Sequence, residues 1–158
     1  MNEVKFISQV CMIAAVVMVC SCSKKVVPAP VEMMTIALPN QEEGTIVLRS
    51  SGQAKNEALA IDDADKKAFR TLLFYGIPSS VQSRPVIENE MQSKQANPAF
   101  FKNFFDKKDY NTFVVNSSTY SSVKRSSKSH YVIRELKINL RSLRANLESN
   151  GVIRKFGF

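Results

Sequence analysis

The strongest constraint on the fold is a long amphipathic pattern over residues 53–76. Apolar side chains recur there every three or four positions, which places them on one face of an α-helix. They are Ala54, Ala58, Ile61, Ala64, Ala68, Leu72 and Tyr75. Gly76 suits the left-handed position after the last turn of this helix, and Pro78 prevents the helix from continuing. Because alanine is small, the helix backbone can lie close to a sheet; an interface with another helix is the alternative.

Segments on both sides of this helix favour β-strands, because they are rich in β-branched residues or alternate in polarity. The strands expected from them span residues 45–52, 110–115 and 131–140. Residues 33–38 can add a short edge strand, and the polar residues 118–130 predict a hairpin or loop. Ser50 or Ser51 can cap the long helix where the first strand ends.

Two further helices are predicted. Asn97 can cap the first, and Pro98 suits its first position. Its aromatic side consists of Phe100, Phe101, Phe104 and Phe105. This side could dip into a membrane interface. We favour a place in the core, because a small domain without Trp needs large side chains to bury enough area.

The last helix follows the final strand, with Asn139 as its cap and Gly151 after its end. Its apolar face consists of Leu140, Leu143 and Leu147. Residues 152–158 can return to the sheet or pack their two phenylalanines on the domain. The order of elements predicts an α+β fold in which helices pack on one face of a small, mainly antiparallel sheet.

The first residues favour export. An uncharged run spans Val10–Val19, after a weakly positive start at Lys5. As a helix this run would rise about 15 Å at about 1.5 Å per residue, whereas a bilayer core is about 30 Å thick. It is too short to span a membrane and has the length of the hydrophobic part of a signal peptide.

Three cysteines lie in this region: Cys11, Cys20 and Cys22. The stretch Val19–Cys22 resembles the lipobox of bacterial lipoproteins, with an aliphatic residue three before the cysteine and a small one directly before it. Cleavage after Ser21 would leave Cys22 as the diacylated first residue. An uncleaved anchor is the first alternative. A metal or redox role is the second, but C-x-C lacks further ligands and differs from the C-x-x-C redox spacing.

This resemblance implies a place in the cell. Two long acyl chains, at about 0.8 kcal/mol per methylene, attach a protein stably to a membrane. Ser23, rather than Asp, follows Cys22, and Lys24 and Lys25 come next. We therefore expect an outer-membrane lipoprotein that faces the periplasm. The expected parts are a signal peptide (1–21), the lipidated cysteine with a proline-containing tether (22–44) and the α+β domain (45–158).

Three blocks of the chain carry a wider resemblance: "LLFYGIP" at the end of the long helix, "FFKNFFDKKDYNTFV" and "YVIRELKINLRSLRANLESNGVIRKFGF". Together with the strand before the helix, they resemble small lipoproteins of Gram-negative envelopes. More distantly, they are similar to lipoproteins associated with flagella and secretion machinery. The resemblance spans about residues 45–158 and implies no catalytic residue.

No motif of an enzyme emerges from the residues. A catalytic nucleophile needs a base beside it, and His130 would be that base. This histidine lies in a basic, serine-rich segment. Asp62, Asp63 and Asp65 lack the glycine and the terminal glutamate of a calcium loop. The phosphate-binding G-x-x-x-x-G-K pattern is absent. We therefore expect a non-enzymatic protein without a metal, a cofactor or a small-molecule substrate; a hydrolase using His130 is the least favoured alternative.

The net charge of +8 (22 basic and 14 acidic side chains) suits an anionic neighbour or merely aids solubility. Lys124, Arg125 and Lys128 form the best candidate patch, although a solvated hairpin is the simpler interpretation. An exported chain rarely meets nucleic acid. The first hypothesis is an assembly or accessory component that binds another envelope protein. The alternative is a module that binds an anionic glycan or lipid through the basic hairpin.

Overall fold

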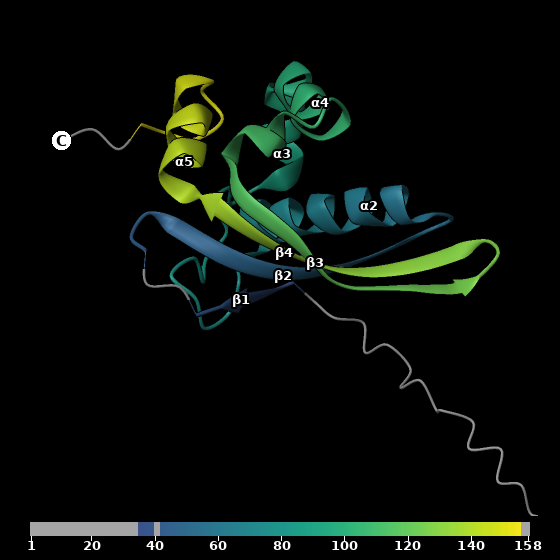
Figure 1. Cartoon of the computed structure of the whole chain (residues 1–158). Coiled ribbons are helices and arrows are strands. Elements are labelled where there is room, and N and C mark those ends of the chain that lie inside the picture. Colours follow the sequence, from purple (N-terminus) through teal and green to yellow (C-terminus); the bar gives the residue numbers. More distant parts are fainter. Residues whose placement is uncertain (1–34, 40–41, 156–158) are drawn as a thin grey trace, which may run out of the picture. The chain divides into compact units, whose positions relative to one another are not determined.

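Four antiparallel strands form one sheet in the computed structural model, which describes residues 35–39 and 42–155 (Figure 1). Their order in the sheet is β1-β2-β4-β3. The strands are β1 Ile36–Leu38, β2 Thr45–Ala54, β3 Val114–Ser126 and β4 Ser129–Asn139. Helices pack on one face of this sheet, so the predicted α+β fold is confirmed.

Four α-helices and two other helical turns complete the described part of the chain. They are α2 Glu57–Arg70, the π-helical turn η1 Thr71–Tyr75, α3 Glu90–Ala96, α4 Pro98–Asp106, the 3₁₀ turn η2 Asp109–Phe113 and α5 Leu140–Ser149. The predicted signal peptide, the lipidation site Cys22, most of the tether and the two terminal phenylalanines lie outside the described residues.

The first strand is longer than the sequence predicted. β2 stays paired with β4 as far as Ala54, opposite His130, so neither Ser50 nor Ser51 caps the long helix. Asn56 caps it instead: its side-chain oxygen accepts a hydrogen bond from the Leu59 backbone N–H at 2.9 Å. The serine caps were wrong because cross-strand hydrogen bonds occupy those residues, whereas Asn56 is the first cap-forming side chain beyond the strand.

Helix α2 lies unusually close to the sheet. A Cβ added at Gly52 would lie 2.0 Å from the carbonyl oxygen of Ala60 and 2.5 Å from the amide nitrogen of Ala64. Ala60, Ala64 and Ala68 are fully buried, so the helix packs on the strands as we favoured, but Ala60 takes the place of the predicted Ala58, which is exposed. Tyr75 was predicted on this face but is 63% exposed, because the π-helical turn η1 changes the residue spacing.

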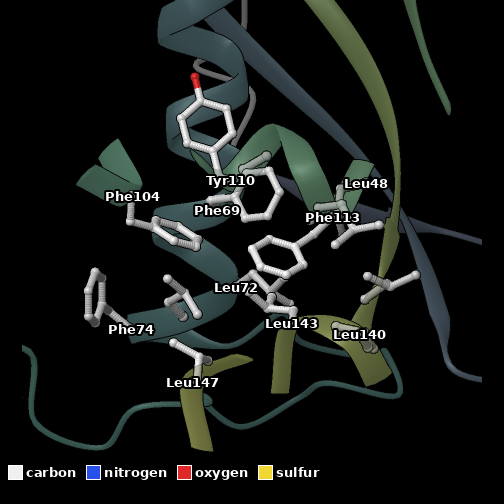
Figure 2. Packing of buried hydrophobic residues seen from close by; sticks show 14 of the residues in the cluster. Leu48, Phe69, Leu72, Phe74, Phe104, Tyr110, Phe113, Leu140, Leu143 and Leu147 are labelled. Carbon is white, nitrogen blue, oxygen red and sulfur yellow. The ribbon is translucent and has the colours of Figure 1, made fainter. Parts of the chain in front are cut away.

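The main core combines aromatic side chains with leucines and isoleucines (Figure 2). Phe101 and Phe104 of α4 are buried, and Phe100 and Phe105 pack half-buried against them, so the aromatic side belongs to the core. The Phe104 ring meets Phe69 of α2 edge-on, with their centres 5.8 Å apart. Such contacts add to the free energy gained by burying the rings.

The segment before β3 differs from the prediction. Residues 110–115 were expected as a strand, but β3 begins at Val114 and the preceding residues form η2. Lys108 has a φ of 62°, which turns the chain sharply before η2. A 3₁₀ turn brings residues three apart onto one side, so Tyr110 and Phe113 both enter the core.

Two predictions near the ends of the domain are confirmed. Asn139 caps α5 by accepting a hydrogen bond from the Ser142 N–H, and the three leucines of α5 are buried. The short edge strand is β1, in which Ile36 pairs with Arg49 and Leu38 with Val47. The sheet therefore includes residues that precede Thr45.

Candidate functional site

The candidate site is the sheet face opposite α2, here called the open face. Strand side chains alternate between faces, and the buried residues of β2 and β4 point toward the helices. The register assigns the others to the open face, where no described helix packs. It includes Ile36, Leu38, Val47, Arg49, Gln53, Ser121, Val123, Tyr131, Ile133, Glu135 and Lys137.

Two arginine–tyrosine stacks lie on the open face. The Arg49 guanidinium carbon is 4.1 Å from the centre of the Tyr120 ring, and that of Arg125 is 5.0 Å from the centre of the Tyr131 ring. Arg49 also donates from Nε to Oε1 of Glu135 across the strands, at 3.0 Å. The tyrosine ring and the carboxylate together restrict the Arg49 side chain.

The predicted basic patch lies at the far end of the β3–β4 hairpin. Lys124, Arg125 and Lys128 are all exposed there, but they do not converge. Lys124 is opposite His130 on the side that faces α2, whereas Arg125 stacks on Tyr131 of the open face. Residues 110–134 contain no Asp or Glu. The hairpin is therefore basic on both sides.

His130 lies on a strand rather than in a loop, and it contacts a possible nucleophile. Its Nε2 is 2.9 Å from the Ser122 hydroxyl, which in turn donates to Oε1 of Glu57 at 2.6 Å. A serine that gives its proton to Glu57 does not give it to His130. Within residues 35–39 and 42–155, no side chain orients the histidine through its other nitrogen. The arrangement therefore lacks the third member of a catalytic triad.

An ion pair connects the hairpin to α2. Arg134 of β4 donates to Asp65 at 3.1 Å and also to the hydroxyls of Thr119 and Ser117. Burial raises the pKa of Asp65, and the Arg134 guanidinium offsets only part of that effect. These contacts position the base of the hairpin against the helix.

Asp62, one turn earlier, has the opposite shift. Burial alone would raise its pKa, but contacts from Lys108, the Tyr110 hydroxyl and Lys66 together lower it. Oδ1 of Asp62 accepts from Tyr110 at 3.0 Å and contacts Lys108 Nζ at 2.9 Å. Burial and the Asp62 carboxylate raise the pKa of Tyr110. The network joins η2 to α2 and lies on the helical side, away from the open face.

Among the described residues, no helix has the length and apolarity needed to cross a bilayer, and no group of three metal-ligating side chains comes together. A cavity of about 750 Å³ lies between the β1–β2 connection, residues 79–82 and the start of α5. Arg144 donates to Gln82 at its wall, at 2.6 Å. The lining carries both acidic and basic side chains, so its charge does not favour one class of ligand.

The two stacks were not predicted from the sequence. Tyr120 and Tyr131 were each assigned to a hairpin or a strand, and Arg49 to a strand, without a functional role. Alternation along the strands could have placed Arg49 and Tyr131 on one face. Tyr120 lies under Arg49 at a register shift between Thr119 and Ser121 of β3. That shift could not have been predicted from the sequence. Comparison with known protein families, curated proteins and solved structures gave no match.

Proposed function

We propose that this chain is a membrane-anchored lipoprotein that acts, without catalysis, as an interaction or assembly component of the cell envelope. Lipid on Cys22 attaches it to the outer membrane on the periplasmic side. Its open face, together with the basic β3–β4 hairpin, binds an acidic surface of another envelope protein.

The observation that carries this proposal is the pair of arginine–tyrosine stacks on a sheet face that no described helix covers. Tyrosine and arginine are enriched among the residues that contribute most to protein–protein binding. Tyr120 is 62% exposed, and the aliphatic residues Ile36 and Val123 are 42% and 39% exposed. The face thus combines apolar area with two oriented guanidinium groups, of which that of Arg49 is paired with Glu135.

The chemistry of the partner follows from charge. Residues 110–134 contain Lys and Arg but no Asp or Glu, and the hairpin carries Lys124, Arg125 and Lys128 at its end. A partner with an acidic surface would gain both attraction at a distance and charge-assisted hydrogen bonds to the guanidinium groups. An envelope location is supported by the resemblance of Val19–Cys22 to a lipobox.

Site-specific photocrosslinking in native membranes tests the proposal. A photoreactive amino acid replaces Tyr120 in the full-length chain, and the matched control places it at Gln95, an exposed residue of α3. We expect one discrete adduct from position 120, little from position 95, and loss of the position-120 adduct when Arg125 is changed to Glu. Equal adducts at both positions, or an adduct that survives Arg125→Glu, would contradict a docking role for the open face.

The second candidate function is binding of an anionic glycan or lipid by Lys124, Arg125 and Lys128, which the exposed basic end of the hairpin favours. The double variant Lys124→Glu with Arg125→Glu separates the two. Loss of binding to vesicles containing phosphatidylglycerol, with the position-120 adduct only weakened, favours the anionic ligand. Loss of the adduct without any vesicle binding by the wild-type chain favours the protein partner.

A further inference from the structure

A second candidate site lies on the helical side of the domain, away from the open face. A cavity of about 460 Å³ is formed by α4, η2 and the end of α5. The residues of its lining that bear on its chemistry are Phe100, Asn103, Asp109, Thr112, Asn146 and Asn150. Its volume is within the range of small-molecule sites.

Three asparagines line this cavity: Asn103 of α4, Asn146 of α5 and Asn150, which follows the end of α5. The side-chain amides of Asn103 and Asn146 have no hydrogen-bond partner within the described residues. Asn150 is held in place, because its Nδ2 donates to the Asn146 carbonyl oxygen at 2.8 Å, and its Oδ1 can accept from a ligand. Each amide offers both donors and an acceptor. The cavity therefore offers hydrogen bonds of both kinds at several points.

One wall is aromatic. The Phe100 ring stacks on Phe104, with ring centres 5.6 Å apart and planes at 27°, so one of its faces is turned to the core. Phe100 remains partly exposed, whereas Phe104 is 1% exposed. A partly exposed ring beside amides provides an apolar surface for the C–H groups of a ligand whose polar groups meet the asparagines.

The charge of the lining excludes an anionic ligand. Neither Lys nor Arg is among the lining residues, and Asp109 contributes a carboxylate. The last turn of α5 also ends here: the Asn146 carbonyl oxygen accepts from the Asn150 N–H at 3.1 Å. Carbonyl groups at a helix end carry partial negative charge. A cation would use only the acceptors and leave the amide N–H groups unpaired, so a neutral ligand that both donates and accepts fits best.

We infer that this cavity binds a neutral saccharide. A sugar ring has one face of C–H groups for Phe100 and a rim of hydroxyls, each a donor and an acceptor, for the asparagines, Thr112 and Asp109. This site is separate from the basic hairpin and prefers a ligand of different charge. It gives the domain a second function that does not depend on the protein partner proposed for the open face.

Binding is measured by saturation-transfer NMR and isothermal titration with the full-length chain in a detergent without sugar groups. The ligands are chitotriose, cellotriose and maltotriose, with trigalacturonate and choline as charged comparisons. We expect saturable binding of at least one neutral trisaccharide. The double variant Asn103→Ala with Asn146→Ala should weaken it about tenfold or more, as the loss of two hydrogen bonds predicts.

The matched control is Asn111→Ala, which changes an exposed asparagine of η2 that does not line the cavity. It should bind as the wild type does. Phe100→Leu keeps an apolar side chain against the core, removes the ring face and should weaken binding. Circular dichroism checks that each variant is folded. The inference is overturned if no neutral trisaccharide binds, if a charged ligand binds more tightly, or if Asn111→Ala weakens binding as much as the double variant.

Discussion

The two ends of the β2–β4 pair meet α2 and its neighbours in different ways. At one end, here called the aromatic end, Leu48 and Leu136 pack under a cluster that includes Phe69, Phe104 and Tyr110 (Figure 2). At the other, the alanine end, Gly52 and Val132 lie against Ala60 and Ala64. The first is stabilised by the area of large side chains, the second by close approach of two backbones.

This difference indicates which kind of substitution should destabilise each end. Packing at the aromatic end depends on large side chains, so truncating one of them should lower the free energy of unfolding. Packing at the alanine end depends on small residues that let two backbones approach, so enlarging one of them should lower the free energy of unfolding. The Asp65–Arg134 ion pair lies between the two ends, since Arg134 is opposite Ser50, and the hairpin leaves the domain beyond the alanine end.

The largest effect is expected at the aromatic end. Phe69 is fully buried, so Phe69→Ala should lower the free energy of unfolding by about 3–5 kcal/mol. Denaturant titration of the full-length chain measures it. The matched control is Tyr75→Ala, which removes an aromatic ring that is 63% exposed and should have a small effect. Similar losses for the two variants would contradict the core that the structure places around Phe69.

The alanine end should respond to the smallest addition. Gly52→Ala puts a methyl group on the Ala60 backbone, and we expect a loss of about 3 kcal/mol, the upper part of the overpacking range. The comparison is Gly151→Ala, where no atom lies within 4 Å and only the φ of 68° opposes a side chain, at about 1 kcal/mol. A loss at Gly52 no larger than that at Gly151 would show that α2 does not lie so close to the sheet.

Asp62 and Asp65 of α2 should make opposite contributions to the pH dependence of stability. The pKa of Asp62 is lowered on folding, so its contribution is present above the unfolded pKa of about 3.9 and is lost as pH falls. The pKa of Asp65 is raised, so its contribution is present below about 3.9 and is lost as pH rises. Urea titrations across this range compare the wild type with Asp62→Asn and Asp65→Asn. The wild-type advantage should grow with pH over the first and shrink over the second; slopes of one sign would contradict these environments.

The smallest effect on stability is expected on the open face. Tyr120 is 62% exposed, so Tyr120→Ala should change the free energy of unfolding by no more than about 0.5 kcal/mol. The same change removes the ring under Arg49 and should weaken binding of the partner. Thermal unfolding and pull-down of the partner identified by crosslinking measure the two effects. A large loss of stability would make Tyr120 a structural residue.

Local patterns predicted the regular elements well. The helix periodicity of residues 53–76 and the leucine spacing of the last helix placed α2 and α5, and the cap at Asn139 was identified from its residue type. Ends of elements were less predictable. Ser50 and Ser51 have the chemistry of helix caps, but pairing with β4 extended the strand through them. A strand end depends on the partner strand, which lies about 80 residues away in the sequence.

The sequence by itself determined the helices and the alternation of the strands, because both depend on residues near one another in the chain. Only the tertiary structure decided which side chains share the open face and which line the cavity between α4, η2 and α5. Arg49 meets Tyr120, and Asn103 and Asn146 line one cavity, through strand register and helix packing. Those arrangements depend on contacts between distant segments, which no local pattern contains.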